Sequence, residues 1–400
     1  MHKRKASDSR SVKMTFMFIY LLYMSAKALF NPYVTLFLQE KGYETAVIGM
    51  ITAANSLVII FSQPFWGILS DRMNSIKLPL IFCMVLQAGT ALLLKNAAAV
   101  AAVMPLYCLF GFFSSPEGPL LDTWSLMSLK QAGDQGGVGR LKFLGCLGYS
   151  ACSTMTALAV SRSNAAAMLP VYAAVLLATA GILAMVREKA PERKGGMDRE
   201  AVGSLLRDRG FLMLLGYVFL MQIPHRMAYT FFATYITHLG GGRELVGFTS
   251  AVMFLSEGIM LYFSKRLFAH FRPQRVVLGS SMFFFLWQVL YAVIPSAPWV
   301  VGIAALDGPS YGLFCIGMLY TLDAMAPGSL RATYQTVAYA VYFGLAGIAG
   351  NALGGFLIDA VGYRTMYGLG AALTAASSVG YGLLMKRKEK ENHACAGHCR

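Results

Sequence analysis

The sequence predicts an all-α membrane protein in which twelve transmembrane helices form two six-helix bundles. Three observations predict this fold class: a composition poor in charge, a series of long apolar stretches, and one long polar interruption near the middle of the chain. Of the 400 residues, 56% are hydrophobic and 13% are charged, whereas a soluble globular chain carries about 25% charged residues. So little charge cannot cover a water-facing surface of this size. The composition therefore excludes a disordered chain and argues against a soluble enzyme.

The apolar stretches of the first half are long enough to cross a bilayer, whose core takes about 20 residues of helix. The first stretch is too long for a secretory signal and has no small-residue cleavage site after it, so we expect it to be a retained span. The fourth stretch contains carboxylates and prolines and gives a weak signal. The six spans are expected at residues 15–38, 46–69, 78–95, 99–126, 139–161 and 166–186.

The second half repeats this arrangement. Its fourth stretch, the tenth of the chain, again carries a carboxylate and a proline. The six spans are expected at residues 211–236, 245–264, 275–294, 299–322, 333–358 and 364–385. The predicted domains are a first bundle at 1–186, a cytoplasmic linker at 187–209, a second bundle at 210–386 and a cytoplasmic tail at 387–400.

The basic residues predict the orientation. Lys and Arg number 34 against 19 Asp and Glu, which gives a net charge of +15. With both termini placed in the cytoplasm, 27 basic residues fall on the cytoplasmic side, 5 on the external side and two, Lys27 and Arg226, inside spans. This asymmetry is the positive-inside signal of a multi-pass protein of the cytoplasmic membrane. The excess charge therefore indicates topology and contact with lipid, and it does not indicate a nucleic-acid partner.

The two halves match each other at a fixed offset of 198 residues. Gly42 aligns with Gly240, and Gly49 aligns with Gly247. At the same offset the intramembrane Lys27 falls on His225. Parallel six-helix repeats with a site between them at the bilayer midplane are typical of transporters.

Ionisable side chains inside a membrane are costly, and they usually face a cavity and take part in function. Lys27, His225 and Arg226 lie near the centres of their spans and are predicted to bind substrate, although each could instead be half of a structural ion pair. Glu257 and Asp307 are predicted to carry protons, or else to be paired with Lys27 or Arg226. The full set of ionisable residues in the spans or at their margins is Lys27, Glu117, Asp122, Arg140, Lys142, His225, Arg226, Glu257 and Asp307.

The loop after the second span resembles a motif of a known family. Residues 67–77 read Gly-Ile-Leu-Ser-Asp-Arg-Met-Asn-Ser-Ile-Lys, similar to the G-x-L-x-D-R-x-G-x-x-K loop of the major facilitator superfamily. Asn74 replaces the usual glycine, which is tolerable because Asn adopts the left-handed conformation more readily than most residues. The resemblance implies a gating role, whose residues are Gly67, Asp71, Arg72 and Lys77.

Shorter stretches narrow the resemblance. Residues 63–67, 119–122 and 139–149 are similar to the lactose permease and oligosaccharide:proton symporter branch, which implies that Asp122, Lys142 and Tyr149 bind substrate. The seventh and eighth spans are more similar to relatives that carry phenylpropionate or nucleosides. The sequence departs from lactose permease in four places. Lys142 replaces an arginine and loses its bidentate fork, and Asp307 replaces a histidine. The ninth span has no arginine, and Glu257 lies about one turn away from the sugar-binding carboxylate of the eighth span.

These features predict a secondary active transporter that moves a sugar, a nucleoside or an organic acid by alternating access. Proton symport into the cell is the favoured mode, with the proton gradient as energy source, no cofactor, no metal and a monomer as the functional unit. A proton-coupled efflux antiporter of the same fold is the first alternative, although Gly145 and Gly148 are not followed by the Gly-Pro of drug antiporters. A membrane-embedded enzyme is less favoured, because no HExxH motif and no large external loop are present. The His and Cys residues of 393–399 could bind a soft metal ion, but a tail without a site is the favoured interpretation.

Overall fold

Every regular element that the computed structural model describes is helical, as the composition predicts. The structure describes residues 2–131, 138–161, 164–188, 208–326 and 331–398. Most of the predicted linker, the side chain of Arg140 and the side chains of residues 388–400 in the predicted tail lie outside the described part of the chain. The backbone of α16 is described as far as His398.

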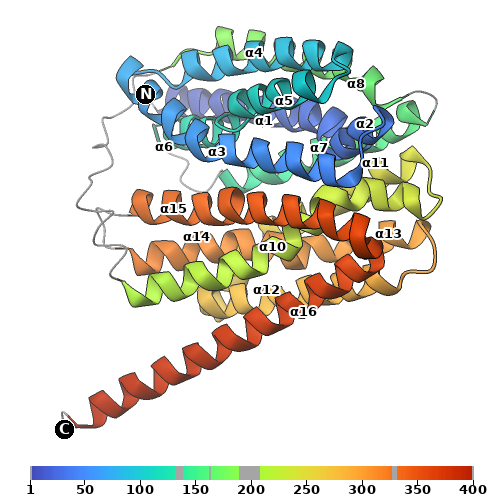
Figure 1. Ribbon diagram of the computed structural model, residues 1–400. Coiled ribbons are helices and arrows are strands. Elements are labelled where there is room, and N and C mark those ends of the chain that lie inside the picture. Colours follow the sequence, from blue (N-terminus) through green and yellow to red (C-terminus); the bar gives the residue numbers. More distant parts are fainter. Residues whose placement is uncertain (1, 132–137, 162–163, 189–207, 327–330, 399–400) are drawn as a thin grey trace.

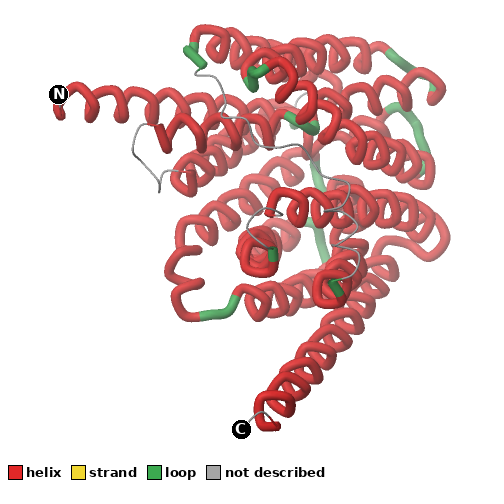
Figure 2. The backbone as a smooth tube through the Cα atoms, turned by 90° about the vertical axis from the view of Figure 1, so that its left-hand side faces the viewer, coloured by secondary structure: helices red, strands yellow, loops and turns green. Residues whose placement is uncertain are grey.

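The helices form two groups that lie one above the other in Figures 1 and 2. The upper group consists of α1 (His2–Phe30), α2 (Val34–Glu40), α3 (Thr45–Met73), α4 (Lys77–Asn96), α5 (Val100–Ser114), α6 (Glu117–Gln131), α7 (Val138–Val160) and α8 (Met168–Met185). The lower group consists of α10 (Arg209–His238), α11 (Arg243–His270), α12 (Pro273–Val293), α13 (Pro298–Ile303), α14 (Leu313–Met325), α15 (Arg331–Tyr339) and α16 (Ala346–His398). Two π-helical turns, Gly308–Gly312 and Ala340–Leu345, interrupt the lower group.

Eleven stretches of the described residues are long and apolar enough to cross a membrane. Ten of them coincide with predicted spans. The eleventh, Tyr334–Arg387, has 54 residues, which as straight helix would measure about 80 Å against a core of about 30 Å. Its backbone is broken at Gly362, where φ is 79° and ψ is 167°, and the chain turns back toward the other side at its right-hand end in Figure 1. Both of the last two predicted spans lie within this stretch.

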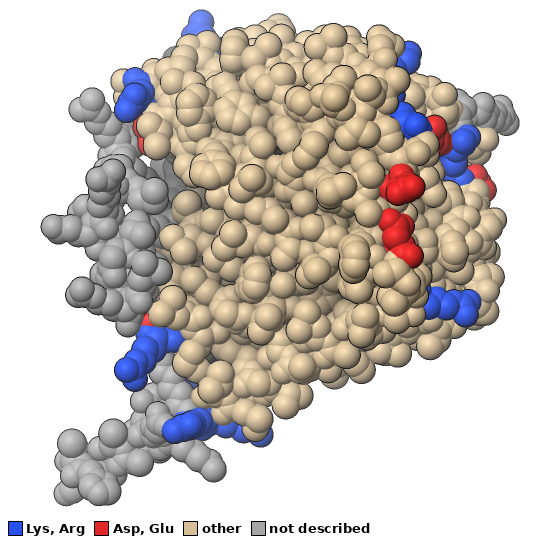
Figure 3. All heavy atoms as spheres, in the orientation of Figure 1, with Lys and Arg blue, Asp and Glu red and all other residues tan. Residues whose placement is uncertain are grey.

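The surface has the character that lipid requires. On the face drawn in Figure 3, the described Lys, Arg, Asp and Glu side chains gather at the two ends of the helices and leave a neutral band between them. Large apolar side chains such as Phe61 (67%), Met155 (72%) and Phe356 (63%) are exposed. Exposed apolar area on this scale indicates contact with a membrane. The beginning of α1 and the end of α16 lie on the same side, at the left of Figure 1.

The two groups approach closely at two glycines that the repeat relates. A Cβ atom on Gly49 of α3 would lie 2.6 Å from the carbonyl oxygen of Asn351 in α16. A Cβ atom on Gly247 of α11 would lie 2.7 Å from the carbonyl oxygen of Ser153 in α7. Ordinary contacts between such atoms are near 3.5 Å or longer, so only glycine fits. We call these two contacts the glycine seam.

The end of the predicted gating loop is bound by Glu188, a residue at the beginning of the predicted linker. Asn74 adopts the left-handed conformation, with φ of 48°, as the comparison with glycine predicts. Glu188 accepts hydrogen bonds from Ser75 Oγ (2.5 Å) and from the backbone nitrogens of Ile76 (2.6 Å) and Lys77 (3.1 Å). It therefore acts as the N-terminal cap of α4.

Replacing Glu188 with Ala is expected to lower the free energy of unfolding by about 1–2 kcal/mol, because the first turn of α4 loses its acceptor. Thermal melting of the purified protein, together with limited proteolysis of this loop, measures the effect. Glu188→Gln keeps an acceptor oxygen and should lose less. Equal losses for Ala and Gln would contradict the capping role.

Candidate functional site

Arg226 lies near the middle of α10, and its surroundings come from the second half of the chain. Its guanidinium stands over the ring of Phe343, 4.6 Å from the centroid, and Phe343 belongs to the π-helical turn Ala340–Leu345. Gly350 of α16 allows this approach, because a Cβ atom there would lie 2.7 Å from Arg226 Cβ. Arg226 Nε and Nη2 are buried and have no hydrogen-bond partner among the described residues.

Glu257 and Asp307 lie next to each other on neighbouring elements. Asp307 precedes the π-helical turn Gly308–Gly312, whose first amide donates to Ser256 Oγ at 2.9 Å. A Cβ atom on Gly308 would lie 2.9 Å from the backbone nitrogen of Glu257. Among the described residues, neither acid forms an ion pair within 4.0 Å. The sequence leaves open that these acids form ion pairs with Lys27 or Arg226. Within the described part of the chain, the structure contains neither ion pair.

The first half contributes a polar cluster that combines two predicted residues. Lys142 of α7 forms an ion pair with Asp122 of α6 at 2.7 Å, and both side chains are more than one-third exposed, at 39% and 38%. The hydroxyl of Tyr20 donates to the same carboxylate. Gly258, next to Glu257 in α11, packs against the side chains of Cys146 (2.9 Å from its Cβ position) and Phe143 (3.3 Å) in α7, so the cluster and the acid pair lie in one region between the halves.

Tyr149 lies at the interface between the two halves and not on an open surface. Its ring stacks on Phe254 of α11 with a centroid distance of 3.5 Å and an interplanar angle of 16°. Only 2% of Tyr149 is exposed. The ring face that the resemblance assigns to substrate is covered by Phe254 in this conformation.

Lys27 and His225, which the repeat relates, both lie inside their own halves. Lys27 forms a 2.6 Å ion pair with Glu117, whose side chain is fully buried. His225 donates from Nδ1 to Gln222 Oε1 at 3.0 Å and stacks on Tyr311 with a centroid distance of 4.8 Å. His225 and Arg226 thus point to different surroundings, as adjacent residues of a helix must.

Glu117→Gln is expected to lower the free energy of unfolding by about 3–5 kcal/mol, because it leaves the Lys27 ammonium buried without a counter-charge. The double variant Lys27→Met/Glu117→Leu should recover most of that loss, since both charges are removed together. Thermal melting in detergent is the measurement. A double variant as unstable as the single one would show that the charges are needed for more than each other.

The predicted gating residues divide into two groups. Lys77 donates to the carbonyl oxygens of Ala184 (2.6 Å) and Val186 (2.8 Å). Asp71 and Arg72 are exposed, and the described residues offer their side chains no hydrogen bond or ion pair. Gly67 has open space around it. In this conformation the motif is tied to α8, and its aspartate and arginine are unengaged.

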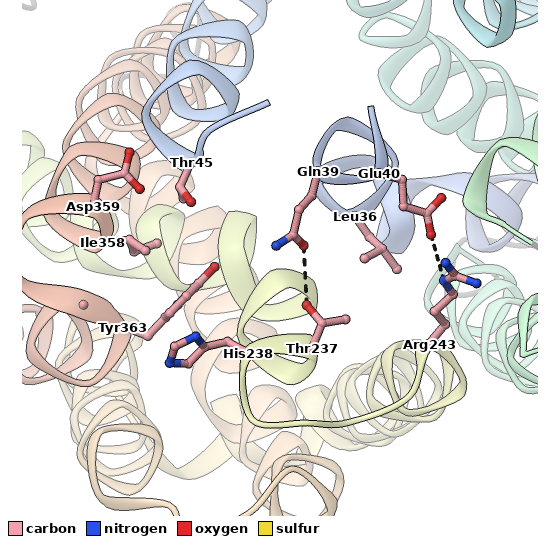
Figure 4. A pocket seen from close by; sticks show the side chains of 11 residues that line it. Leu36, Gln39, Glu40, Thr45, Thr237, His238, Arg243, Ile358, Asp359 and Tyr363 are labelled. Atoms are coloured by element: carbon pink, nitrogen blue, oxygen red, sulfur yellow. Dashed lines mark hydrogen bonds and ion pairs between the residues drawn. The ribbon is translucent and has the colours of Figure 1, made fainter. Parts of the chain in front are cut away.

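The opposite end of the molecule holds contacts between the halves. Glu40 forms an ion pair with Arg243 at 2.7 Å, and Thr237 Oγ1 donates to Gln39 Oε1 at 3.4 Å. Gln39 and Thr237 are 198 residues apart, which is the offset of the repeat. These side chains line a pocket of about 650 Å³ at this end (Figure 4). Asp359 of the same pocket accepts from the first turn of α3, at the Ala46 nitrogen, at 2.7 Å.

Sequence reasoning missed three parts of the site. The two π-helical turns carry no recognisable pattern, yet one follows Asp307 and the other presents Phe343 to Arg226. Such turns occur frequently at functional sites. The pairing of Lys27 with Glu117 was one of several possible pairings, and only the fold selects it. Pro309 lies in the first of these turns and Pro116 lies directly before Glu117, but neither proline by itself predicts a π turn or an ion pair.

Two groups of membrane-length helices, with paired and unpaired charges between and within them, define an integral membrane transporter. The chain belongs to the MFS_1 like family of the major facilitator superfamily, whose profile matches residues 14–369. This confirms the resemblance of the 67–77 loop.

The relatives are transporters and not enzymes. The uncharacterized transporter YwbF of Bacillus subtilis (strain 168) is 23% identical over 96% of this chain and 94% of its own length. The maltose permease of Geobacillus stearothermophilus is 27% identical over 86% of each chain. The putative nucleoside transporter YegT of Escherichia coli (strain K12) is 23% identical over 81% of this chain and 79% of its own.

A solved structure shares the fold. The crystal structure of the nucleoside transporter NupG superposes with a TM-score of 0.82 at 14% identity and covers 94% of this chain and 99% of that one. A point mutant of NupG gives a TM-score of 0.83 over 93% of this chain and 99% of that one. The chain is therefore a multi-pass membrane transporter of the major facilitator type.

Proposed function

We propose that the chain imports a small polar solute across the cytoplasmic membrane together with protons. The observation that carries the proposal is the pair Glu257 and Asp307, two acids of the second half whose backbone segments pack against each other and whose side chains have no cation in ion-pair range among the described residues. Burial away from a counter-charge favours the neutral form of an acid. Such a pair can take up a proton on one side of the membrane and release it on the other.

The proposed topology has twelve passes with both termini in the cytoplasm. The break at Gly362 divides the long eleventh stretch into two passes, and the 27-to-5 distribution of basic residues supports the orientation. In this orientation the Glu40–Arg243 end faces outward. The glycine seam and that ion pair then close the outer side, so the structure corresponds to the inward-facing state of an alternating-access cycle in which a monomer works alone.

The proposed substrate site lies between the halves, with Asp122, Lys142 and Tyr149 on one side and Arg226 on the other. The names of the relatives, maltose permease and nucleoside transporter, favour a solute with a sugar ring. Organic acids remain in the candidate set because Arg226 is unpaired.

A thermal-shift screen of the purified protein against maltose, uridine and glucuronate, at one mildly acidic and one neutral pH, tests the proposal. A true ligand at 100 times its Kd stabilises by about 2.7 kcal/mol, and its effect should differ between the two pH values. Sorbitol at the same concentration controls for the general stabilisation by excluded solutes. Stabilisation no greater than that of sorbitol for every compound would count against a solute site of this kind.

A further inference from the structure

One complete edge of the Arg226 guanidinium has no hydrogen-bond partner among the described residues. Nε and Nη2 are the two nitrogens of a single edge of the fork, and both are buried without a hydrogen-bond partner among the described residues. The ring of Phe343 covers a face of the group. An edge of this kind donates two parallel N–H bonds, the geometry that matches a carboxylate.

Arg226 differs in this respect from the other intramembrane cations whose side chains the structure describes. Lys27 is paired with Glu117 and Lys142 with Asp122, at 2.6 and 2.7 Å. No carboxylate of the described residues lies within ion-pair distance of Arg226. A buried cation without a partner is costly, so the arrangement is unfavourable until an anion arrives.

Hydrogen bonds link the face of α10 that carries Arg226 to the first half of the chain. Thr230, one helical turn further along the same face of α10, donates to Asn351 at 2.6 Å. Asn351 in turn donates to Thr52 O (3.2 Å) and Ser56 Oγ (3.1 Å) of α3 in the first half. The face of α10 that carries Arg226 is therefore the face turned toward the other half.

We propose that Arg226 binds the carboxylate of a singly charged organic anion, which is the transported solute. This inference rests on the proposed function and narrows it from neutral sugars and nucleosides to acids. The anion is expected to carry one negative charge, because Arg226 supplies one positive charge without a partner. A phosphate ester carries nearly two negative charges at neutral pH and would leave one of them without a counter-charge. Phe343 stands in an aromatic group with Tyr342 (4.4 Å) and Tyr339 (5.9 Å), which gives the body of the anion a ring-shaped surface to pack on.

Equilibrium binding to the purified full-length protein, with matched acids and neutral compounds, tests the proposal. The sugar set is glucose, glucuronate and glucose 6-phosphate, and the aromatic set is benzyl alcohol, benzoate and phenyl phosphate. At least one carboxylate should bind about tenfold or more tightly than its neutral and phosphate counterparts, because a hydrogen bond to a charged group contributes about 1.5–3 kcal/mol. The proposal is overturned if neither carboxylate exceeds its neutral partner, or if a phosphate ester is preferred.

Substitutions at the same helix separate a binding role from a structural one. Arg226→Gln should remove the preference for the acid, and Arg226→Lys, which keeps the charge but loses the fork, should keep only part of it. Arg209→Gln, an exposed arginine at the start of the same helix, should leave the preference unchanged. Unchanged preference in Arg226→Gln, with a melting temperature close to that of the parent, would assign the acid to another site.

Failure of this inference and failure of the proposed function give different results. If a neutral sugar or nucleoside binds in a pH-dependent way and Arg226→Gln binds it equally well, the transporter assignment stands and the anion assignment fails. If glucuronate or benzoate binds at Arg226 but no flux follows in proteoliposomes, the anion site stands and transport fails.

Discussion

Glu257→Gln and Asp307→Asn should each abolish accumulation of solute against its gradient and leave exchange of solute across the membrane partly intact. Each variant removes one of the two acids that lie on packed neighbouring segments and form no ion pair with a described cation. Exchange needs only the conformational change of the loaded carrier, whereas accumulation needs a proton to be taken up and released in each cycle. Uptake into proteoliposomes with an imposed pH gradient should fall to background, and counterflow should continue.

Glu44→Gln is the matched control, because Glu44 is an exposed carboxylate at the beginning of α3 and its side chain makes no cap hydrogen bond there. It should accumulate solute as the parent does. Wild-type rates of accumulation in both Glu257→Gln and Asp307→Asn would rule out the coupling role.

Gly49→Leu and Gly247→Leu should each prevent the halves from closing at the end that holds Glu40 and Arg243, and so stop transport almost completely. At both positions even a Cβ atom would approach the opposite half to 2.7 Å or less, well inside an ordinary contact, and Leu adds three more carbon atoms. The two halves must move apart to make room for the leucine side chain, and the close contact at that glycine is lost.

Alkylation of a cysteine introduced at Thr237, which lines the pocket at the Glu40–Arg243 end, measures the opening. A membrane-impermeant maleimide should react faster in the Gly49→Leu and Gly247→Leu backgrounds than in the parent. Gly89→Leu is the control, since Gly89 is an exposed glycine of α4 with nothing within 4 Å of its Cβ position. Similar reaction rates and normal transport in all backgrounds would show that the seam does not control access.

Hydropathy alone predicted the helices because lipid demands a long apolar stretch for each pass, and Asn74 could be assigned its left-handed conformation from residue type. The residues of the candidate site could be selected one at a time, because any charge inside a span is costly. Their partners could not be predicted. Several carboxylates within the spans are possible ion-pair partners for Lys27. Glu117 is the partner because of the way α1 packs against α6.

The sequence also could not predict that Arg226 has no ion-pair partner among the described residues. It depends on the π-helical turn that places Phe343 over the guanidinium and on Gly350, which brings α16 close to α10. The offset of 198 residues, by contrast, carried real structural information. Gly49 and Gly247 make the two equivalent contacts of the glycine seam, and Gln39 and Thr237 form a hydrogen bond between the two halves.

Proton-driven accumulation in proteoliposomes is the most direct test of the central claim that this chain is a proton-coupled importer. Purified protein is reconstituted, an inward proton gradient is imposed, and uptake of labelled maltose, uridine, glucuronate and benzoate is followed with and without a protonophore. We predict that at least one compound accumulates above its external concentration and that the protonophore releases it. If every compound only equilibrates, or if accumulation persists after the proton gradient has collapsed, the claim is contradicted.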